Sequence, residues 1–264
     1  MHRRAVVPGA CSAEYVFAEN GHHTIRMEDG TDSDWMDQDW MSAIEAEIPK
    51  AVDALVEGSR PLRTIGHSDR VGIAMFINLL WYTIPKQIRR SMEMTPRSAR
   101  EAAFFADWKA AHSAPPPDPE ALRQFALGRA VQLVFERSPD IANRAWQLLR
   151  VDPSSSTSLV LSDDPVLDYS LPAKDGDAYT VMAIPLDPRV LLVIYPFDQP
   201  DLPDGELKET DVRLANRRAW AQSDNAVVGL TTADLDHASL SRTPMLPGAI
   251  RDMLVARVPR LYGR

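Results

Sequence analysis

The feature that most constrains the fold is a change in hydrophobic periodicity near residue 150. Before this point, apolar residues recur with the spacing of a helix that buries one face. After it, short apolar and β-branched runs alternate with Pro, Asp and Gly, which is typical of strands and turns; these runs are residues 159–161, 179–184 and 190–195. The change predicts an α+β fold in which a helical half, about 34–150, packs on a small strand-rich part, about 155–235, in a single domain over 1–264.

Proline and glycine divide the helical half into segments. Pro49 lies inside an amphipathic stretch and should kink or split that helix, because proline has no N–H to donate. Gly58 favours the end of the same helix. Ser68 and Asp69 offer an N-cap for a helix over 70–84. Ser138 followed by Pro139 predicts the start of a new helix over 140–150.

Two regions outside the central helices also carry local signals. Asn20 and Gly21 tolerate positive φ, which predicts a hairpin between 15–18 and 23–27. Residues 209–222 have helical spacing and predict one late helix, followed by a short strand over 227–230.

Composition narrows the class of protein. The chain has 264 residues and 45% apolar residues, enough for a sizeable core. Cys11 is the one cysteine, so an internal disulfide framework is ruled out and a cytoplasmic location is expected. The longest apolar run, 71–84, contains Asn78 and is shorter than the ~20 residues of a membrane span. Pro8 and Gly9 interrupt the apolar N-terminal stretch too early for an export signal.

The charge balance bears on partners. The formal net charge is -8, and the basic residues are 24 Arg and five Lys. An acidic chain without a concentrated basic face is not typical of a general nucleic-acid binder. A protein partner remains open, and no membrane partner is indicated.

Common catalytic and phosphate-binding signatures are missing from the sequence, including GxGxxG, GxxxxGK[ST], GxSxG, HExxH and CxxC. Pro203-Asp204 and Glu206-Leu-Lys208 resemble the carboxylate and lysine pieces of a restriction-type nuclease core. We interpret residues 203–208 as one loop that lacks the strand which such a core places between these pieces.

The segment that most resembles a site is 161–166, where a predicted strand ends in Ser162, Asp163 and Asp164 before Pro165. Functional side chains often gather at strand ends. The same residues also form turns in which a side chain satisfies backbone N–H groups. Adjacent aspartates in extended chain point to opposite faces, so at most one of them would serve as a ligand or base.

Two further candidates lie on predicted helices. Arg89 shares a face with Lys86 and Arg90 if the helix resumes after Pro85, and this face could hold an anionic group. The alternative is an ordinary solvated face. Glu45 is likewise an exposed helix residue unless it turns inward.

The order of several motifs resembles that of an uncharacterised, mostly bacterial family called domain of unknown function 4238. The matching stretches contain Glu45 in 44–55, the apolar helix ending in Pro85, Trp146, Ser162-Asp-Asp-Pro-Val166, Pro185-Leu-Asp-Pro188 and Asn216. The resemblance covers most of residues 7–230. It implies no established activity and marks Glu45, Asp163 and Asn216 as candidate residues.

The chain departs from the family pattern at two places. Arg4 and Ala5 stand where the N-terminal histidine of the family would fall, and Thr83-Ile84-Pro85 replaces Arg-Thr-Pro. If that histidine and arginine serve chemistry in relatives, this chain is a degenerate or re-purposed member, or its assigned start is too late.

Two functions are therefore compared. The first is a hydrolase, metal-dependent and acting on a phosphoester, in which Glu45 and Asp163 bind a divalent cation and act in catalysis. Arg89, Asn216 and Ser162 would then bind the substrate. The second is a non-catalytic binding or protein-interaction module in which 162–165 and 185–188 are structural turns. A separation of more than ~10 Å between the Glu45 and Asp163 carboxylates would exclude the shared cation.

Overall fold

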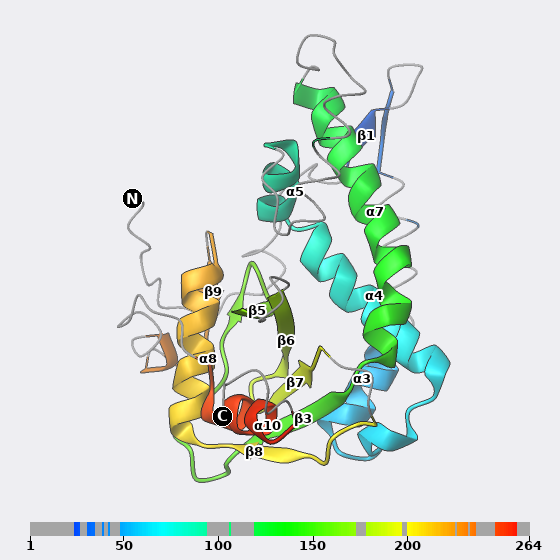
Figure 1. Cartoon of the computed structure of the whole chain (residues 1–264). Coiled ribbons are helices and arrows are strands. Elements are labelled where there is room, and N and C mark those ends of the chain that lie inside the picture. Colours follow the sequence, from blue (N-terminus) through cyan, green and yellow to red (C-terminus); the bar gives the residue numbers. More distant parts are fainter. Residues whose placement is uncertain are drawn as a thin grey trace. The chain divides into compact units, whose positions relative to one another are not determined.

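The computed structural model divides the chain into two compact units (Figure 1). It describes residues 24–26, 31–34, 39, 42, 48–93, 106, 119–172, 178–196, 200–224, 226–231, 233–235 and 246–257. We call the first the sheet unit, and its described residues lie within 51–66 and 143–264. We call the second the helical unit, and its described residues lie within 19–50 and 67–142. Helices and a mixed sheet make this an α+β protein. The single domain over 1–264 stays a prediction.

The helical unit contains α4 (His67–Tyr82), α5 (Pro85–Met92) and α7 (Pro119–Asn143). Pro85 is the first residue of α5, where its missing N–H costs no helical hydrogen bond. Ile88 on α5 packs with Ala126, Leu127 and Ala130 of α7 in a small apolar core. The chain therefore does resume a helix after Pro85, and this helix presents Arg89 and Arg90 to solvent.

A two-stranded ladder also belongs to the helical unit. β1 (Ile25–Arg26) pairs antiparallel with β2 (Asp32–Ser33). The predicted partner strand over 15–18 lies outside the described residues. Arg123 of α7 donates to the Thr24 carbonyl oxygen and to Glu120, so a helix side chain holds the start of this ladder.

Proline 139 lies inside α7 and starts no new helix, so the predicted helix over 140–150 is wrong. Pro139 has no N–H to bond to the preceding turn. The Ser138 hydroxyl donates to the Val134 carbonyl oxygen and accepts from the Asn78 amide at 3.0 Å, so this turn has side-chain hydrogen bonds. Helix α7 ends at Asn143, and a strand begins three residues later.

The sheet unit is built on five strands in the order β5-β6-β7-β3-β8. Neighbours pair antiparallel except β3 and β8, which pair parallel. The strands are β3 (Trp146–Val151), β5 (Leu167–Pro172), β6 (Ala178–Asp187), β7 (Val190–Ile194) and β8 (Gly205–Leu207). A separate ladder joins β4 (Leu161–Ser162) to β9 (Val227–Val228).

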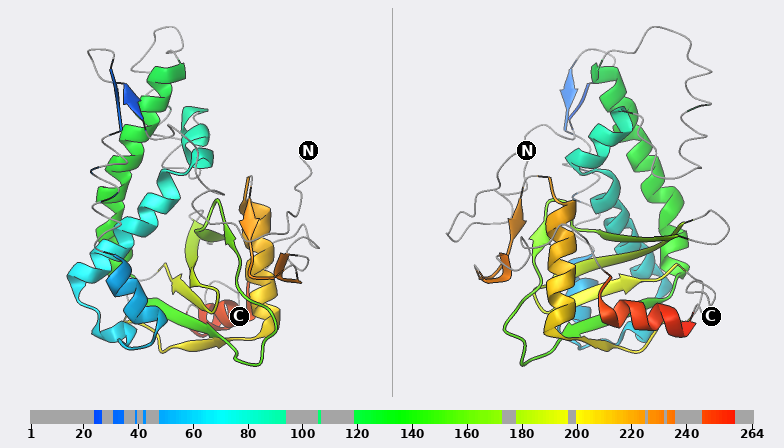
Figure 2. Two further views of the ribbon diagram at one scale, coloured as in Figure 1. Left: turned by 180° about the vertical axis from the view of Figure 1, so that it is seen from behind. Right: turned by 60° about the vertical axis from the view of Figure 1, so that its left-hand side comes forward.

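The described residues of the sheet unit also form most of α3 (Pro49–Val56), the 3-10 turn η2 (Leu62–Thr64), α8 (Glu209–Gln222) and α10 (Gly248–Arg257). Pro49 begins α3, so the proline divides the predicted helix at its own position. Helix α8 has the predicted bounds. Figure 2 shows α8 and α10 beside the sheet.

One apolar core joins α8 and α10 to the sheet. Leu149 and Val151 of β3 pack in it with Val212 of α8 and Ile250 of α10. Alternate residues of β3 and β7 therefore face these helices, and Arg150 and Val190 point to the opposite face of the sheet. The Asp211 carboxylate accepts from the backbone N–H of Lys208 at 3.3 Å and of Gly248 at 2.6 Å, so it fixes the first turns of α8 and α10 together.

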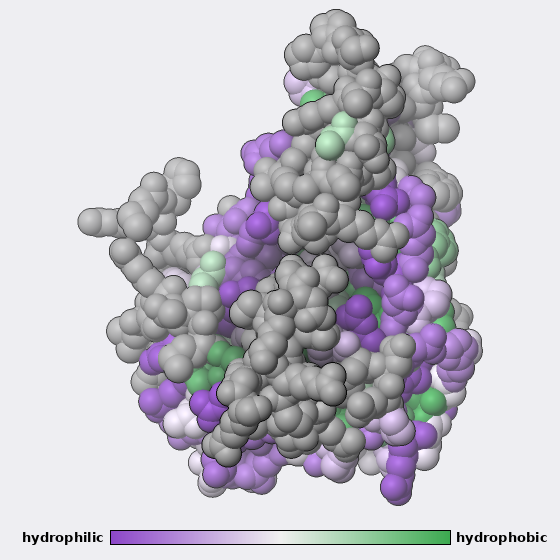
Figure 3. Space-filling model, viewed as in Figure 1, coloured by the Kyte–Doolittle hydropathy of each residue, from purple (hydrophilic) through white to green (hydrophobic). Residues whose placement is uncertain are grey.

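On the face shown in Figure 3, hydrophilic residues predominate among the coloured residues and the apolar ones are scattered. Phe135 and Leu230 are the large apolar residues that are exposed in the described part of the chain. Within that part, no helix is long and apolar enough to cross a membrane.

Gly205 tests the close approach of β8 to β3. A Cβ atom at Gly205 would lie 2.7 Å from Leu149 Cδ2, inside the core of the sheet unit. We expect Gly205→Ala to lower the free energy of unfolding by about 1–3 kcal/mol, because the crowding has to be relieved by a shift of buried atoms.

The matched control is Gly66→Ala in the same unit, where an added Cβ meets no atom within 4 Å. This change should stay within about 0.5 kcal/mol. Urea unfolding followed by tryptophan fluorescence measures both. Equal stability of the two variants would contradict the close strand approach.

Candidate functional site

The predicted site residues fall in different places. Ser162, Asp163 and Asn216 lie in the sheet unit, and Arg89 lies on α5 of the helical unit. Glu45 lies outside the described residues, so the distance between the Glu45 and Asp163 carboxylates stays untested. The roles of Arg89 in substrate binding and of Glu45 in metal binding remain predictions.

Asp163 connects the end of β4 to the loop before β9. Its two carboxylate oxygens accept from the backbone N–H of Asp224 at 3.1 Å and of Ala226 at 3.3 Å. Its own N–H donates to the Ala226 carbonyl oxygen at 3.1 Å. Three hydrogen bonds thus hold the loop against the strand, which is the turn-forming use of aspartate that the sequence left as an alternative.

Ser162 is buried beside it. Its hydroxyl donates to the Asp164 carbonyl oxygen at 2.7 Å, within the turn that leads to Pro165. The hydroxyl hydrogen is therefore used inside the turn, and this geometry supports a structural role for the residue.

Asn216 of α8 imitates the edge of a strand. Its side-chain oxygen accepts from the Val160 N–H at 3.0 Å, and its amide nitrogen donates to the Ser158 carbonyl oxygen at 2.7 Å. Asn216 is 1% exposed, so these bonds satisfy backbone groups that have no access to water. Neither group of the Asn216 amide points to an open surface.

Gln222, one and a half turns later on α8, repeats this arrangement. Its side-chain oxygen accepts from the Asp168 N–H at 3.1 Å, and its amide nitrogen donates to the Val166 carbonyl oxygen. Two amide side chains of one helix therefore pair with the extended chain on both sides of the Ser162–Asp163 turn.

Asn216, Gln222 and Asp234 all bond through their side chains to the backbone of residues 158–168, and we call this set of side chains the clasp. Sequence reasoning missed Asp234. One Asp234 oxygen accepts from the Ser158 N–H at 2.7 Å, and the other accepts from the N–H and hydroxyl of Thr231. The Asp234 N–H donates back to the Thr231 hydroxyl oxygen at 3.3 Å. This reciprocal pair is a capping box, and its Thr-x-x-Asp spacing is visible in the sequence.

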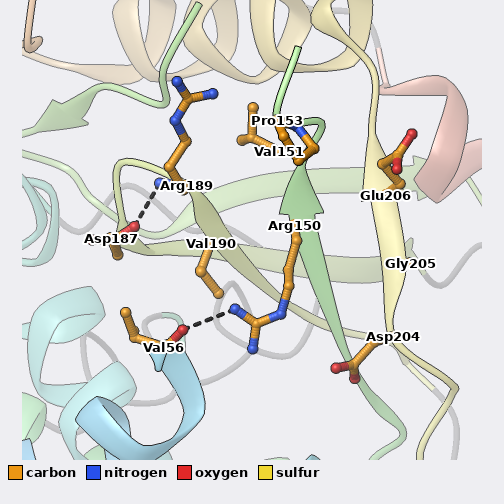
Figure 4. Close-up of a pocket in the computed structure, with 10 residues that line it drawn as sticks. All are labelled: Val56, Arg150, Val151, Pro153, Asp187, Arg189, Val190, Asp204, Gly205 and Glu206. Carbon is orange, nitrogen blue, oxygen red and sulfur yellow. Dashed lines mark hydrogen bonds between the residues drawn. The ribbon is translucent and has the colours of Figure 1, made fainter. Parts of the chain in front are cut away.

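A cavity of about 580 Å³ lies elsewhere in the sheet unit (Figure 4). It is formed by the C-terminus of α3, the end of β3, the β6–β7 turn and β8. Its charged lining residues are Arg150, Asp187, Arg189, Asp204 and Glu206, and its apolar ones include Val56, Val151, Pro153 and Val190. A volume in this range is typical of ligand-binding pockets.

Arg150 closes the helix end of the cavity. Its guanidinium donates to the carbonyl oxygens of Leu55 at 2.7 Å and Val56 at 2.8 Å, the last turn of α3 (Figure 4). A cation at this position complements the negative end of the helix dipole. Gly58 ends the helix with φ +73°, and a Cβ there would lie 3.4 Å from Arg150 Nη2.

The two other walls are turns of the sheet. Asp187 accepts from the Arg189 N–H at 2.7 Å and so fixes the β6–β7 turn, within the Pro185-Leu-Asp-Pro188 motif. On the opposite side, Gln147 donates to the Pro203 carbonyl oxygen at 2.9 Å and positions Asp204. Gln147 also accepts from the Tyr195 hydroxyl, and burial raises the pKa of Tyr195 above its usual value.

The interpretation of residues 203–208 as one loop is wrong. Residues 205–207 form β8, with Arg150 opposite Glu206 in the parallel register. Asp204 and Glu206 line the cavity, and Lys208 is the N-cap of α8. The strand is three residues long and forms because it pairs with β3. Local propensity does not predict such a distant pairing.

A metal centre has no counterpart among the described residues. Within them, no three His, Cys, Asp or Glu side chains gather in a way that could hold a metal ion. The divalent cation of the hydrolase hypothesis therefore stays a prediction that depends on Glu45.

Together, the geometry defines an α+β protein with a five-stranded mixed sheet, a polar clasp on α8 and a charged cavity beside β8. The chain belongs to the family described as protein of unknown function DUF4238, whose sequence model matches residues 1–233. Neither the curated proteins nor the solved structures contain a match to this chain.

Asn216→Asp tests the clasp. The change keeps the acceptor for the Val160 N–H and replaces the donor to the Ser158 carbonyl oxygen by a carboxylate oxygen. We expect the free energy of unfolding at pH 7 to fall by about 2–4 kcal/mol, since two oxygens then face each other without water. The deficit should shrink below about pH 5, because the new carboxyl gains a proton to donate and its folded-state pKa lies above the unfolded value of ~3.9.

The control is Asn143→Asp at the exposed end of α7. It should cost less than about 1 kcal/mol, because a carboxylate at the C-terminal end of a helix is only weakly unfavourable, and any recovery at low pH should be equally small. Urea unfolding between pH 4 and pH 8 measures both. A small, pH-independent effect of Asn216→Asp would contradict the strand-mimicking role.

Proposed function

We propose that this chain is a non-catalytic binding module rather than a hydrolase. The observation that carries the proposal is the use of the Asp163 carboxylate, whose two oxygens accept backbone N–H groups of the loop before β9. Each oxygen of this carboxylate already accepts a backbone N–H, so fewer of its lone pairs are left for a cation or a proton. Ser162 and Asn216 support the same proposal, because their polar groups bond to the backbone of their own unit.

The family motifs support a structural interpretation of both turns. Ser162-Asp-Asp-Pro-Val166 contains the Asp163 turn, and Pro185-Leu-Asp-Pro188 contains the Asp187 bond to the Arg189 N–H. In this proposal the motifs shape the sheet unit, and the ligand enters the cavity beside β8. The hydrolase hypothesis rests on Glu45 and Asp163 sharing a divalent cation, and it is the alternative that the experiment below addresses.

The proposal extends to location and partner. The single cysteine and the resemblance to a mostly bacterial family support a location in the bacterial cytoplasm, and the partner in this proposal is another protein.

Asp163→Ala separates the two functions. We expect it to lower the melting temperature by several degrees, because about 1–3 kcal/mol is lost when the Asp224 and Ala226 N–H groups lose their acceptor. The decrease should be the same in EDTA, Mg²⁺, Mn²⁺ and Zn²⁺. Differential scanning fluorimetry of the full chain in each condition measures it.

Asp53→Ala is the matched control, because Asp53 is an exposed aspartate on α3. Its melting temperature should remain close to that of the unchanged protein. A metal-specific rise in the melting temperature of the unchanged protein, kept by Asp53→Ala and lost by Asp163→Ala, would overturn the proposed function and favour the metal-dependent hydrolase.

A further inference from the structure

We propose that the cavity beside β8 binds the cationic end of a lysine or arginine side chain from a partner protein. The inference rests on the proposed binding function and names the chemistry of its ligand. It follows from how the five charged side chains of the cavity are used, and from the apolar surface beside them.

The two arginines of the cavity are directed to backbone oxygens. Arg150 donates to the Leu55 and Val56 carbonyls, and Arg189 Nη1 donates to the Ser155 carbonyl oxygen at 3.2 Å. Figure 4 shows the Arg150 guanidinium extending to the end of α3. The positive charge of Arg150 therefore lies against the negative end of a helix, so Arg150 attracts an anionic ligand less strongly.

The carboxylates of Asp204, just before β8, and Glu206, within it, are used differently. Both residues are exposed, and their side chains make no hydrogen bond or ion pair with other residues in the described part of the chain. Glu206 stands opposite Arg150 in the parallel register, yet the Arg150 guanidinium bonds to α3 instead. The cavity thus presents acceptor oxygens along β8 to an incoming group that supplies N–H donors and positive charge.

Apolar residues beside these carboxylates fit the rest of such a side chain. Val56, Val151, Pro153 and Val190 line the same cavity, and Val56 and Pro153 are the more exposed of the four. Lysine and arginine carry their charge on an alkyl stem that packs on apolar surface while the charged end reaches a polar partner. A cavity with apolar side chains and carboxylates at one strand matches both parts of that side chain.

The electrostatic balance also favours a cation. The lining has three carboxylates against two guanidinium groups, and the whole chain has a net charge of -8. A negative surface raises the local concentration of cations and speeds the approach of a basic partner.

The test compares three probes by NMR titration of the full chain. They are butylguanidinium, which is a free alkyl-guanidinium with the same single charge, the peptide acetyl-Gly-Arg-Gly-amide, and inorganic phosphate. We expect the peptide to bind in roughly the millimolar range, and Asp204→Asn combined with Glu206→Gln to weaken it about tenfold or more. Glu57→Gln, a change of an exposed glutamate outside the cavity lining, should leave binding unchanged.

Several outcomes would overturn the inference. Peptide binding that is unaffected by the double variant, or equally weakened by Glu57→Gln, would show that the cavity carboxylates are not the site. Tighter binding of phosphate than of the peptide would assign the cavity to anions. Equal or tighter binding of butylguanidinium would show that the cavity does not favour a protein side chain over a free alkyl-guanidinium, and would overturn the inference.

These outcomes are separate from a failure of the proposed function. If Asp163→Ala changes stability alone and no probe binds, the proposed binding function is retained and the proposal of a cationic ligand is rejected. If Asp163→Ala removes a metal-specific stabilisation, the binding module itself fails, whatever the probes do.

Discussion

Buried backbone groups between Ser158 and Asp168 impose the constraint on which the sheet unit depends. Up to Val166 this segment lies outside the five-stranded sheet, so its N–H and C=O groups lack a full complement of strand partners and have to be satisfied in another way. Asn216 and Gln222 supply side-chain amides that act as surrogate peptide groups. Helix α8 is therefore a packing element and also a hydrogen-bonding edge, which explains why amide side chains stand on a helix that faces an apolar core.

The same principle operates at the ends of helices, where polar side chains replace missing backbone partners. Asp211 satisfies the first turns of α8 and α10, and Arg150 satisfies the last turn of α3. Each of these residues joins elements that are distant in the sequence. These polar residues of the sheet unit are thus structural. The carboxylates of Asp204 and Glu206 differ from them, because they bond to no other residue in the described part of the chain.

Sequence reasoning succeeded where a local signal decides the structure. The bounds of α8, the division at Pro49 and the end of α3 near Gly58 follow from periodicity and from the chemistry of proline and glycine. It failed for β3, because 146–151 is a nearly continuous buried run that periodicity does not separate from a buried helix. It failed for β8 because three residues next to Pro203 carry no strand signal, and their state is set by distant pairing.

The candidate site shows the same division between local and distant information. Ser162 and Asp163 were found because a hydroxyl and a carboxylate before proline form a recognisable strand end, but this pattern is shared by turns and active sites. What separates the two is the partner of the carboxylate, and Asp224 lies 61 residues away in the chain. Asp204 and Glu206 are the opposite case. Their local sequence does not indicate a site, and they become candidates only because α3, β3 and the β6–β7 turn form a cavity around them. A binding function for this chain therefore depends on the charges that folding leaves unused, rather than on the motifs that the sequence makes conspicuous.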